Sequence, residues 1–361
     1  MFTCTEDITR ALVDMPAANG NWRAAAVARQ ANLTKPPGSL GRLEDVAIFL
    51  AGWGNTPAPA CGRIKCAVFA GNHGVTRQGI SPYPASVTEQ MVANFANNGA
   101  AINALTRANG LDLQVLPLAL DEPTGDISVG PAMSTEETVR AMSAGATTVT
   151  DDLDCLAVGE MGIGNTTIAA TLATAVFGGK GADWAGPGTG LAEAGVRHKS
   201  AVVDCAIERF MAGDQVPNDP SSKLATPIEI MRQLGGREIA AIAGAVLAAR
   251  MKRIPVILDG FISTAAIAPF FATSPAIVDH VIAAHVSAEP AHRKLLDAMN
   301  LVPLLDLQLR LGEGTGAALA AGVIRAAVAA HNEMATFEQA GVSNVEGGGE
   351  AEGQPAGKGA I

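Results

Sequence analysis

The chain alternates short apolar runs with longer segments in which apolar residues recur at helical spacing. Short apolar runs bounded by turn residues predict buried strands of a parallel sheet. We expect such strands at residues 64–70, 113–120, 153–158, 254–258 and 278–286. We expect helices within 5–31, onward from Leu43, at 136–144, on both sides of Gly235-Gly236 within 224–250, at 291–299 and at 315–330. This alternation predicts an α/β fold.

The third predicted strand leads into a glycine-rich turn. Gly159 is followed after four residues by Gly164, and then by Asn165 and Thr166, so the spacing approaches a Walker-type phosphate loop with Asn in place of Lys. A turn between a strand and a helix directs backbone N–H groups at an anion, and without the Lys this one suits a single phosphate. A tight turn with Asn and Thr caps explains the same residues. Glu160 is unusual beside an anion unless it serves another part of the ligand.

Other predicted turns carry candidate side chains, because ligands of open α/β sheets bind at the carboxyl ends of the strands. His73 is either a turn residue or a catalyst. Tyr83 lies between prolines and either lines a pocket for a planar ring or packs on the surface. Lys199, in the helix after the glycine turn at 186–190, is either a counter-charge for a phosphate monoester or a solvated residue. Asp259 ends a strand, where it either binds ribose hydroxyls or caps the next helix.

Composition narrows the class of protein. The 361 residues are 48% hydrophobic but only 4% aromatic and include 40 glycines, which suits closely packed strands and helices in one large and one smaller domain. The net charge of −10 argues against a nucleic-acid partner. The five cysteines lack paired spacing, which is typical of reduced thiols in the cytoplasm. The chain begins without signal-peptide blocks, and segment 315–330 is too short to span a bilayer, so we expect a soluble cytoplasmic protein with no membrane partner.

Glu313 stands between two glycines, after an apolar segment and before a helix of small residues. One interpretation is a first-turn acid stabilised by the helix dipole, worth about 0.3–1 kcal/mol. An exposed acid does not need glycine on both sides, whereas glycines allow a backbone or a ring to approach closely. A carboxylate shielded by Leu311 and a flat apolar substrate would have a raised pKa, as a general base near neutrality requires. We therefore favour the general base.

Seven motifs occur in order along the chain: TKPPGSLGRLE (34–44), AGNHGVTRQGISPYP (70–84), GEMGIGNTT (159–167), GPGTGL (186–191), LDGFIS (258–263), SAEP (287–290) and LGEGTGA (311–317). With these motifs the chain resembles the nicotinate-nucleotide–dimethylbenzimidazole phosphoribosyltransferase family, which activates the lower ligand of cobalamin. The resemblance extends from Thr34 to about Ala330. One departure is Ala291, where the family pattern has glycine after SAEP, and it affects only the local backbone.

The resemblance implies a Rossmann-like parallel sheet flanked by helices, a smaller helical domain formed from both ends of the chain, and a homodimer. We expect residues 1–60 and about 300–340 in the small domain, and residues 61–300 in the large domain that carries the nucleotide site. Beyond Gly341 the sequence consists mainly of Gly, Glu, Pro and Ala. We therefore expect residues 342–361 to form a disordered tail.

The resemblance also implies the roles of individual residues. Glu313 is expected to take the proton from the benzimidazole nitrogen, and Glu160 to face the ribose. The nucleotide 5′-phosphate is expected on Gly162, Gly164, Asn165, Thr166, Gly188, Thr189 and Lys199. Ser287 and Ala288 are expected beside the nicotinate, with Asp259 as the further candidate for the ribose. The benzimidazole is expected against Ser81, Tyr83, Gln90, Met161 and Leu311.

The implied reaction needs no metal ion and no cofactor. Nicotinate leaves nicotinate mononucleotide neutral at its ring nitrogen, so one base suffices for direct attack at C1′. Transfer to another lower-ligand base, such as adenine or a phenol, remains open and depends on the pocket near Tyr83. A non-catalytic nucleotide-binding protein would keep the phosphate turns but would not need Glu313. An NAD-dependent dehydrogenase is disfavoured because Thr167 stands where the third glycine of the dinucleotide motif belongs.

Overall fold

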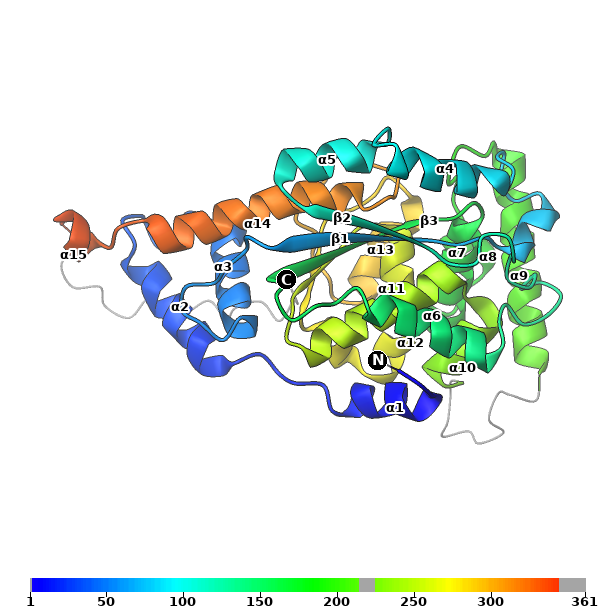
Figure 1. Ribbon diagram of the computed structural model, residues 1–361, viewed down its shortest axis with the longest axis horizontal. Coiled ribbons are helices and arrows are strands. Elements are labelled where there is room, and N and C mark those ends of the chain that lie inside the picture. Colours follow the sequence, from blue (N-terminus) through cyan, green and yellow to red (C-terminus); the bar gives the residue numbers. More distant parts are fainter. Residues whose placement is uncertain (1, 214–224, 344–361) are drawn as a thin grey trace.

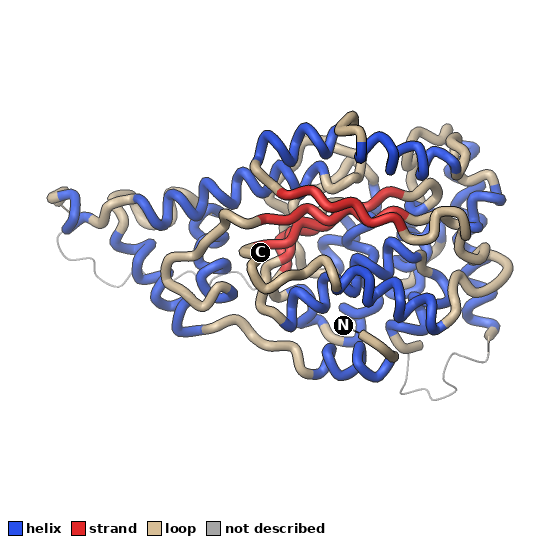
Figure 2. Tube along the Cα trace, in the orientation of Figure 1, coloured by secondary structure: helices blue, strands red, loops and turns tan. Residues whose placement is uncertain are grey.

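The computed structural model describes residues 2–213 and 225–343, which form a five-stranded sheet with helices on both faces (Figure 1). The strands are β1 (Ile64–Ala70), β2 (Asp112–Pro117), β3 (Cys155–Met161), β4 (Val256–Leu258) and β5 (Val281–Ala283). Their order is β2-β1-β3-β4-β5, and every neighbouring pair is parallel. Figure 2 shows the sheet crossing the molecule between layers of helices. The predicted Rossmann-like α/β class is confirmed.

The strand boundaries follow the apolar pattern in part. β1 begins and ends where predicted, and β2, β4 and β5 are shorter than predicted. β3 ends at Met161 rather than Val158, so Gly159 lies inside the strand and pairs with Val68. The prediction that the glycine turn begins at Gly159 is therefore wrong, because only Gly162–Gly164 forms the turn. Glycine is needed at 159 because a Cβ there would lie 2.4 Å from the backbone nitrogen of Gly314.

The helices include all the predicted helical segments. They are α1 (Thr5–Val13), α2 (Gly20–Asn32), α3 (Arg42–Trp53), α4 (Ser86–Ala96), α5 (Ala101–Asn109), α6 (Thr135–Ala146), α7 (Asn165–Phe177), α8 (Gly181–Trp184), α9 (Glu193–Ala212), α10 (Pro227–Leu234), α11 (Arg237–Met251), α12 (Phe261–Thr273), α13 (Pro290–Ala298), α14 (Thr315–Glu333) and α15 (Phe337–Ala340), with 3₁₀ turns η1 (Gly74–Gln78) and η2 (Pro275–Val278). Within the described ranges, none of these helices combines the length and the apolar character needed to cross a membrane.

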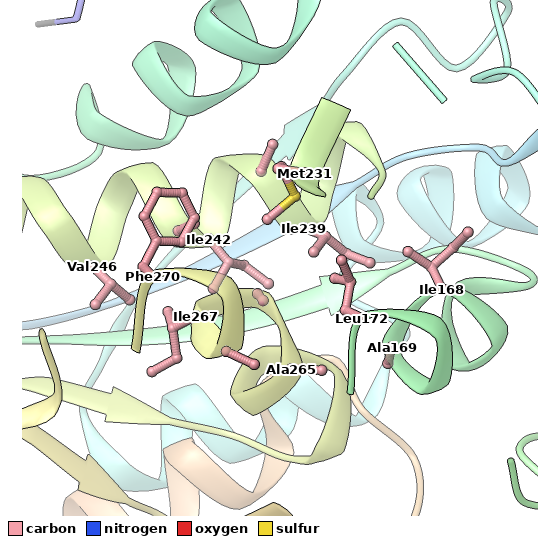
Figure 3. Packing of buried hydrophobic residues seen from close by; sticks show 14 of the residues in the cluster. Ile168, Ala169, Leu172, Met231, Ile239, Ile242, Val246, Ala265, Ile267 and Phe270 are labelled. Atoms are coloured by element: carbon pink, nitrogen blue, oxygen red, sulfur yellow. The ribbon is translucent and has the colours of Figure 1, made fainter. Parts of the chain in front are cut away.

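Alternate strand residues enter two apolar clusters, one on each face of the sheet. The first face packs against helices α6, α7 and α10–α13, and Figure 3 shows side chains of α7, α10, α11 and α12 gathered at its centre. Its strand residues are Ala67, Phe69, Leu156, Val158, Val256, Leu258, Val281 and Ala283. Because helices cover both faces of this parallel sheet, its strands appear in the sequence as continuous apolar runs.

The second face of the sheet is covered by α14 together with α3 and α5. Its strand residues are Ile64, Cys66, Val68, Cys155, Ala157, Ile257 and Ile282. The side of α14 that faces them carries alanines, including the buried Ala317, Ala318 and Ala321. Short side chains allow the backbone of α14 to lie close to the sheet.

Helices from the two ends of the chain pack together at one end of the molecule (Figure 1). α3 packs against both α2 and α14. Leu33 forms an antiparallel bridge with Thr336, and Arg29 Nε donates to the carbonyl oxygen of His331 over 2.7 Å. α1 instead packs into the first-face cluster through Ile8 and Leu12. The division into two domains stays a prediction, and the predicted tail at 342–361 lies outside the described residues from 344 onward.

The chain order in the sheet reverses between β1 and β3. β2 extends the sheet from β1 toward one edge, whereas β4 and β5 extend it from β3 toward the other. Doubly wound α/β folds bind ligands at such a reversal, beyond the carboxyl ends of the strands. Gly71 follows β1 and donates its N–H to the carbonyl oxygen of Met161 over 3.0 Å, and Gly162 follows β3. The candidate site is therefore expected at this edge.

The crossing of α6 and α11 offers a test of the packing. A Cβ on Gly145 of α6 would lie 1.8 Å from the carbonyl oxygen of Ala241 in α11. Gly145→Ala must push the two helices apart, so we expect the free energy of unfolding to fall by about 1–3 kcal/mol in chemical denaturation. Gly20→Ala is the control, because its Cβ would have nothing within 4 Å. An equal loss in the control would contradict this explanation.

Candidate active site

A cavity opens beyond the carboxyl ends of β3, β4 and β5, on the β3 side of the reversal, and no residue of the segment that follows β1 lines it. Ten of the residues predicted for the site line it: Glu160, Met161, Gly162, Asn165, Thr166, Gly188, Thr189, Asp259, Ser287 and Leu311. Four others, Gly164, Lys199, Ala288 and Glu313, adjoin lining residues in sequence or in space. The cavity therefore brings together side chains from five separate motifs.

The turn Gly162–Gly164 links β3 to the start of α7 and forms one wall of the cavity. Gly164 has a φ of 95°, a conformation that glycine adopts without strain. α7 then begins with Asn165 and Thr166 and has no acidic residue in its first turn. A helix N-terminus carries partial positive charge on its amide groups, so this wall suits a phosphate group.

Lys199 connects this turn to the second glycine turn. The Lys199 side chain, from α9, is buried, and its Nζ donates to Thr166 Oγ1 over 3.1 Å and to the carbonyl oxygen of Gly186 over 3.0 Å. A Cβ on Gly188 would lie 3.1 Å from this Nζ, so glycine there leaves room for the ammonium group. Burial lowers the pKa of Lys199, and the Glu289 carboxylate acts in the opposite direction. Lys199 is therefore no solvated helix residue.

Glu289 belongs to the site, although it was not predicted. It lines the cavity, and its Oε2 accepts the N–H of Gly188 over 3.2 Å. Burial raises the pKa of Glu289. The residue lies in the SAEP motif, so the motif was an available signal. His285 and Arg310 also line the cavity and were also missed.

Glu160 is the last residue but one of β3, and its carboxyl group is buried. Burial, followed by the negative charges of Asp259 and Glu238, raises its pKa to about 8. Asn165 Nδ2 donates to Glu160 Oε2, and glycine at 312 makes room for the carboxyl group, since a Cβ there would lie 2.5 Å from Oε1. Glu160 is thus largely protonated at neutral pH, which explains how an acid is accommodated beside an anion site.

Glu313 lies in a turn with three successive positive φ angles, 85° at Gly312, 63° at Glu313 and 85° at Gly314. The Glu313 N–H donates to the carbonyl oxygen of Glu160 over 3.1 Å, which ties the turn to β3. Its Oε2 accepts the N–H of Ile102 at the start of α5 over 3.4 Å. The side chain therefore does not cap α14, whose N-cap residue is Gly314. Burial raises the pKa of Glu313, the direction that a general base requires.

Asp259 follows β4 and holds the same turn from the opposite side. Its Oδ2 accepts the N–H of Gly314 over 3.2 Å, and its Oδ1 accepts the N–H of Ala317 over 3.0 Å. Asp259 therefore caps a helix, but the helix is α14 and not the α12 that follows it in sequence. Burial raises the pKa of Asp259. The negative charge of Asp259 contributes to the raised pKa values of both Glu160 and Glu313. Among the described residues, no group of His, Cys, Asp or Glu is arranged to hold a metal ion.

The loop after β5 places Ser287 at the cavity wall. His292 Nδ1 accepts the Ser287 N–H over 2.9 Å, and its Nε2 is 3.2 Å from Thr264 Oγ1. Burial lowers the pKa of His292 to about 3, which keeps Nδ1 available as an acceptor. Ala288 donates its N–H to the carbonyl oxygen of Leu309 over 2.8 Å. The predicted nicotinate loop is therefore held on both sides.

Only two of the five residues predicted for the base pocket line the cavity. Met161 and Leu311 line the cavity, and Leu311 is 59% exposed. Ser81, Tyr83 and Gln90 do not line it; they come from the loop and helix that follow η1. Tyr83 is 50% exposed, and its N–H donates to Ser81 Oγ over 3.2 Å. The role of these three residues stays a prediction.

Comparison with known proteins identifies the family. The sequence model of a family described as "Phosphoribosyltransferase" matches residues 15–342. The nicotinate-nucleotide–dimethylbenzimidazole phosphoribosyltransferase of Novosphingobium aromaticivorans is 56% identical over 334 residues, which cover 92% of this chain and 96% of that protein. The enzyme of the same name from Allorhizobium ampelinum is 52% identical over 339 residues, covering 94% and 96%.

A solved structure supports the same assignment. The crystal structure of CobT from Thermus thermophilus matches with a TM-score of 0.82 and 40% sequence identity, covering 90% of this chain and 99% of that chain. Sequence identity of this extent, over nearly the full length of the relatives, is what members of one family share. The chain belongs to the nicotinate-nucleotide–dimethylbenzimidazole phosphoribosyltransferase family.

Proposed function

We propose that this enzyme transfers the phosphoribosyl group of nicotinate mononucleotide to 5,6-dimethylbenzimidazole, giving α-ribazole 5′-phosphate and nicotinate. The relatives named above carry the name of this activity. The single observation that carries the proposal is the Glu313 turn, which holds a shielded carboxylate with a raised pKa next to a cavity walled by two glycine turns.

The phosphate half of the site supports binding of the nucleotide. Gly162, Gly164, Asn165 and Thr166 would bind the 5′-phosphate from the α7 side, and Gly188, Thr189 and Lys199 from the other side. Lys199 already donates to Thr166, so its ammonium group lies between the two turns. Neutral Glu160 would face the ribose, with Asp259 beside it, and Ser287 and Ala288 would lie along the nicotinate.

The reaction that fits these residues is a direct displacement. Glu313 takes the proton from one ring nitrogen of the benzimidazole while the other ring nitrogen forms a bond to C1′ of the ribose. The bond from C1′ to the nicotinate nitrogen breaks, and its electron pair neutralises the cationic ring. Attack from the opposite face converts the β-nucleotide into an α-ribotide. Because the leaving group is neutral at the broken bond, no general acid is needed, and Glu313 releases its proton to solvent afterwards.

We further propose that the enzyme acts as a homodimer in the cytoplasm, without a nucleic-acid or membrane partner. The family resemblance supports the homodimer. The net charge of −10 supports the absence of a nucleic-acid partner. The cytoplasmic location is supported by the five cysteines, which are all free: Cys4, Cys61, Cys66, Cys155 and Cys205.

The first experiment measures the proposed reaction. Purified protein is incubated with nicotinate mononucleotide and 5,6-dimethylbenzimidazole, and mass spectrometry detects α-ribazole 5′-phosphate and nicotinate. We expect Glu313→Gln to lower kcat about 100-fold or more, the scale of a lost general base, while the Kd for the nucleotide stays within about twofold. Glu333→Gln, at the exposed end of α14, is the matched control and keeps full activity. Unchanged kcat in Glu313→Gln would remove Glu313 from the mechanism.

The pH dependence gives an independent check. Glu313 accepts a proton only when ionised, so kcat/KM is expected to fall as the pH drops through a pKa above the usual 4.5. Glu160 loses its proton as the pH rises through about 8, so the KM for the nucleotide is expected to increase there. Initial rates with two acceptor bases of different basicity separate enzyme from substrate ionisation. If the pH of the low-pH decrease in kcat/KM shifted with the basicity of the acceptor base, the assignment of this decrease to Glu313 would be contradicted.

A further inference from the structure

A buried pair of His73 and Glu238 lies directly beneath the proposed phosphate turn. His73 follows β1, and Glu238 lies in the first turn of α11. His73 Nε2 is 2.6 Å from Glu238 Oε1, and both side chains are 0% exposed. Neither residue lines the cavity, so neither can touch a bound substrate. The sequence interpretation of His73 as a turn residue leaves this partner unexplained.

The pair is a poor source of stability. Two ionisable groups in an apolar interior cost desolvation free energy, and well-packed apolar residues in their place are often neutral or stabilising. Among the described residues, His73 Nδ1 and Glu238 Oε2 have no hydrogen-bond partner, so the desolvation is not fully compensated. A buried pair with this unfavourable balance points to a role other than holding the fold together.

Three glycines make room for the pair, and each comes from a different segment. A Cβ on Gly71 would lie 2.3 Å from Glu238 Oε2, and one on Gly236 would lie 2.3 Å from His73 Cε1. A Cβ on Gly162 would lie 3.1 Å from both Glu238 Oε1 and His73 Nε2. Gly162 is the first residue of the phosphate turn, so the hydrogen-bonded atoms of the pair lie against the turn itself.

The rest of the turn is held by the same part of the chain as His73. The Ile163 N–H donates to Thr88 Oγ1 over 3.1 Å. A Cβ on Gly164 would lie 3.0 Å from Thr76 Cγ2, and Thr76 Oγ1 in turn donates to the carbonyl oxygen of His73 over 2.7 Å. The pair thus lies against Gly162, as Thr88 and Thr76 lie against the next two residues of the turn.

We propose that His73 and Glu238 are positioning residues that hold the Gly162–Gly164 turn in the conformation that receives the nucleotide 5′-phosphate. This inference rests on the proposed function, since it assigns the pair to the phosphate half of that site. Glu238 also lies close enough to Glu160 to be one of the causes, after burial and Asp259, that raise the pKa of Glu160. The pair therefore acts on nucleotide binding and not on the acceptor base.

The experiment compares nucleotide affinity with the KM for the acceptor base. Isothermal titration calorimetry with nicotinate mononucleotide gives the Kd, and initial rates give the KM for 5,6-dimethylbenzimidazole. We expect His73→Leu to raise the Kd for the nucleotide about tenfold or more, because small displacements of positioning groups weaken binding strongly. The KM for the base should stay within about twofold, since the proposed base pocket includes Met161 and Leu311 but no residue of Gly162–Gly164.

Two conservative variants keep the proposal testable if His73→Leu does not fold. Glu238→Asp retains the charge but shortens the side chain by one methylene, and we expect it to raise the nucleotide Kd about fivefold. His73→Gln restores a donor at the position of Nε2, and we expect it to bind the nucleotide within about threefold of the wild type. A positioning role predicts that nucleotide affinity depends on the hydrogen bond between residues 73 and 238 and not on the imidazole ring of His73.

The matched control removes another buried polar pair far from the cavity. Gln30 Nε2 is 2.9 Å from His331 Nδ1 where α2 packs with the end of α14. Gln30→Leu is expected to lower the melting temperature without changing the nucleotide Kd. Folded His73→Leu or Glu238→Asp with a wild-type Kd would overturn the positioning role. A wild-type protein that does not bind nicotinate mononucleotide would overturn the proposed function and this inference with it.

Discussion

The candidate active site depends on one close contact between two backbones, that of Gly159 in β3 with the turn that begins α14. A side chain at 159 would overlap Gly314, so the turn can lie against the sheet only because this strand residue is glycine. The N–H of Glu313 then reaches the carbonyl oxygen of Glu160, and Asp259 reaches the amides of Gly314 and Ala317. Backbone hydrogen bonds therefore hold the turn that carries the carboxylate, although three successive residues of this turn have positive φ angles.

Burial of several carboxyl groups in one place gives the site its electrostatic character. Glu160, Asp259 and Glu313 come from β3, the end of β4 and the start of α14, and burial raises the pKa of each. A protonated carboxyl group can face a nucleotide without repelling its phosphate, while an ionised one can accept a proton from the acceptor base. In the proposed reaction the same residue type would serve both roles, and the depth of burial and the number of nearby charges would decide which role each glutamate takes.

Local sequence signals predicted many of the residues that line the cavity, and contacts distant in sequence account for the errors in the strands. β1 was predicted to the residue, and Glu313 was singled out because its flanking glycines are adjacent to it. The predicted β3 is too short because Gly159 and Glu160 are typical of turns. Both fit in a strand because Gly314 packs against Gly159 and Gly312 leaves room for Glu160, and these two glycines lie far along the chain. The partner of His73 is 165 residues away, so no local pattern reveals it.

The cover of the second sheet face by α14 has a consequence for synthesis of the chain. All five strands precede α14 in sequence, and within the described part of the chain no other helix lies along the centre of the face formed by Cys66, Ala157 and Ile257. During synthesis all the strand segments are therefore made before the helix that covers this face, and an apolar sheet face left uncovered is prone to aggregation. The arrival of α14 closes the surface and delivers the Glu313 turn in one step. The cover of this apolar face and the placement of the proposed general base therefore depend on the same helix.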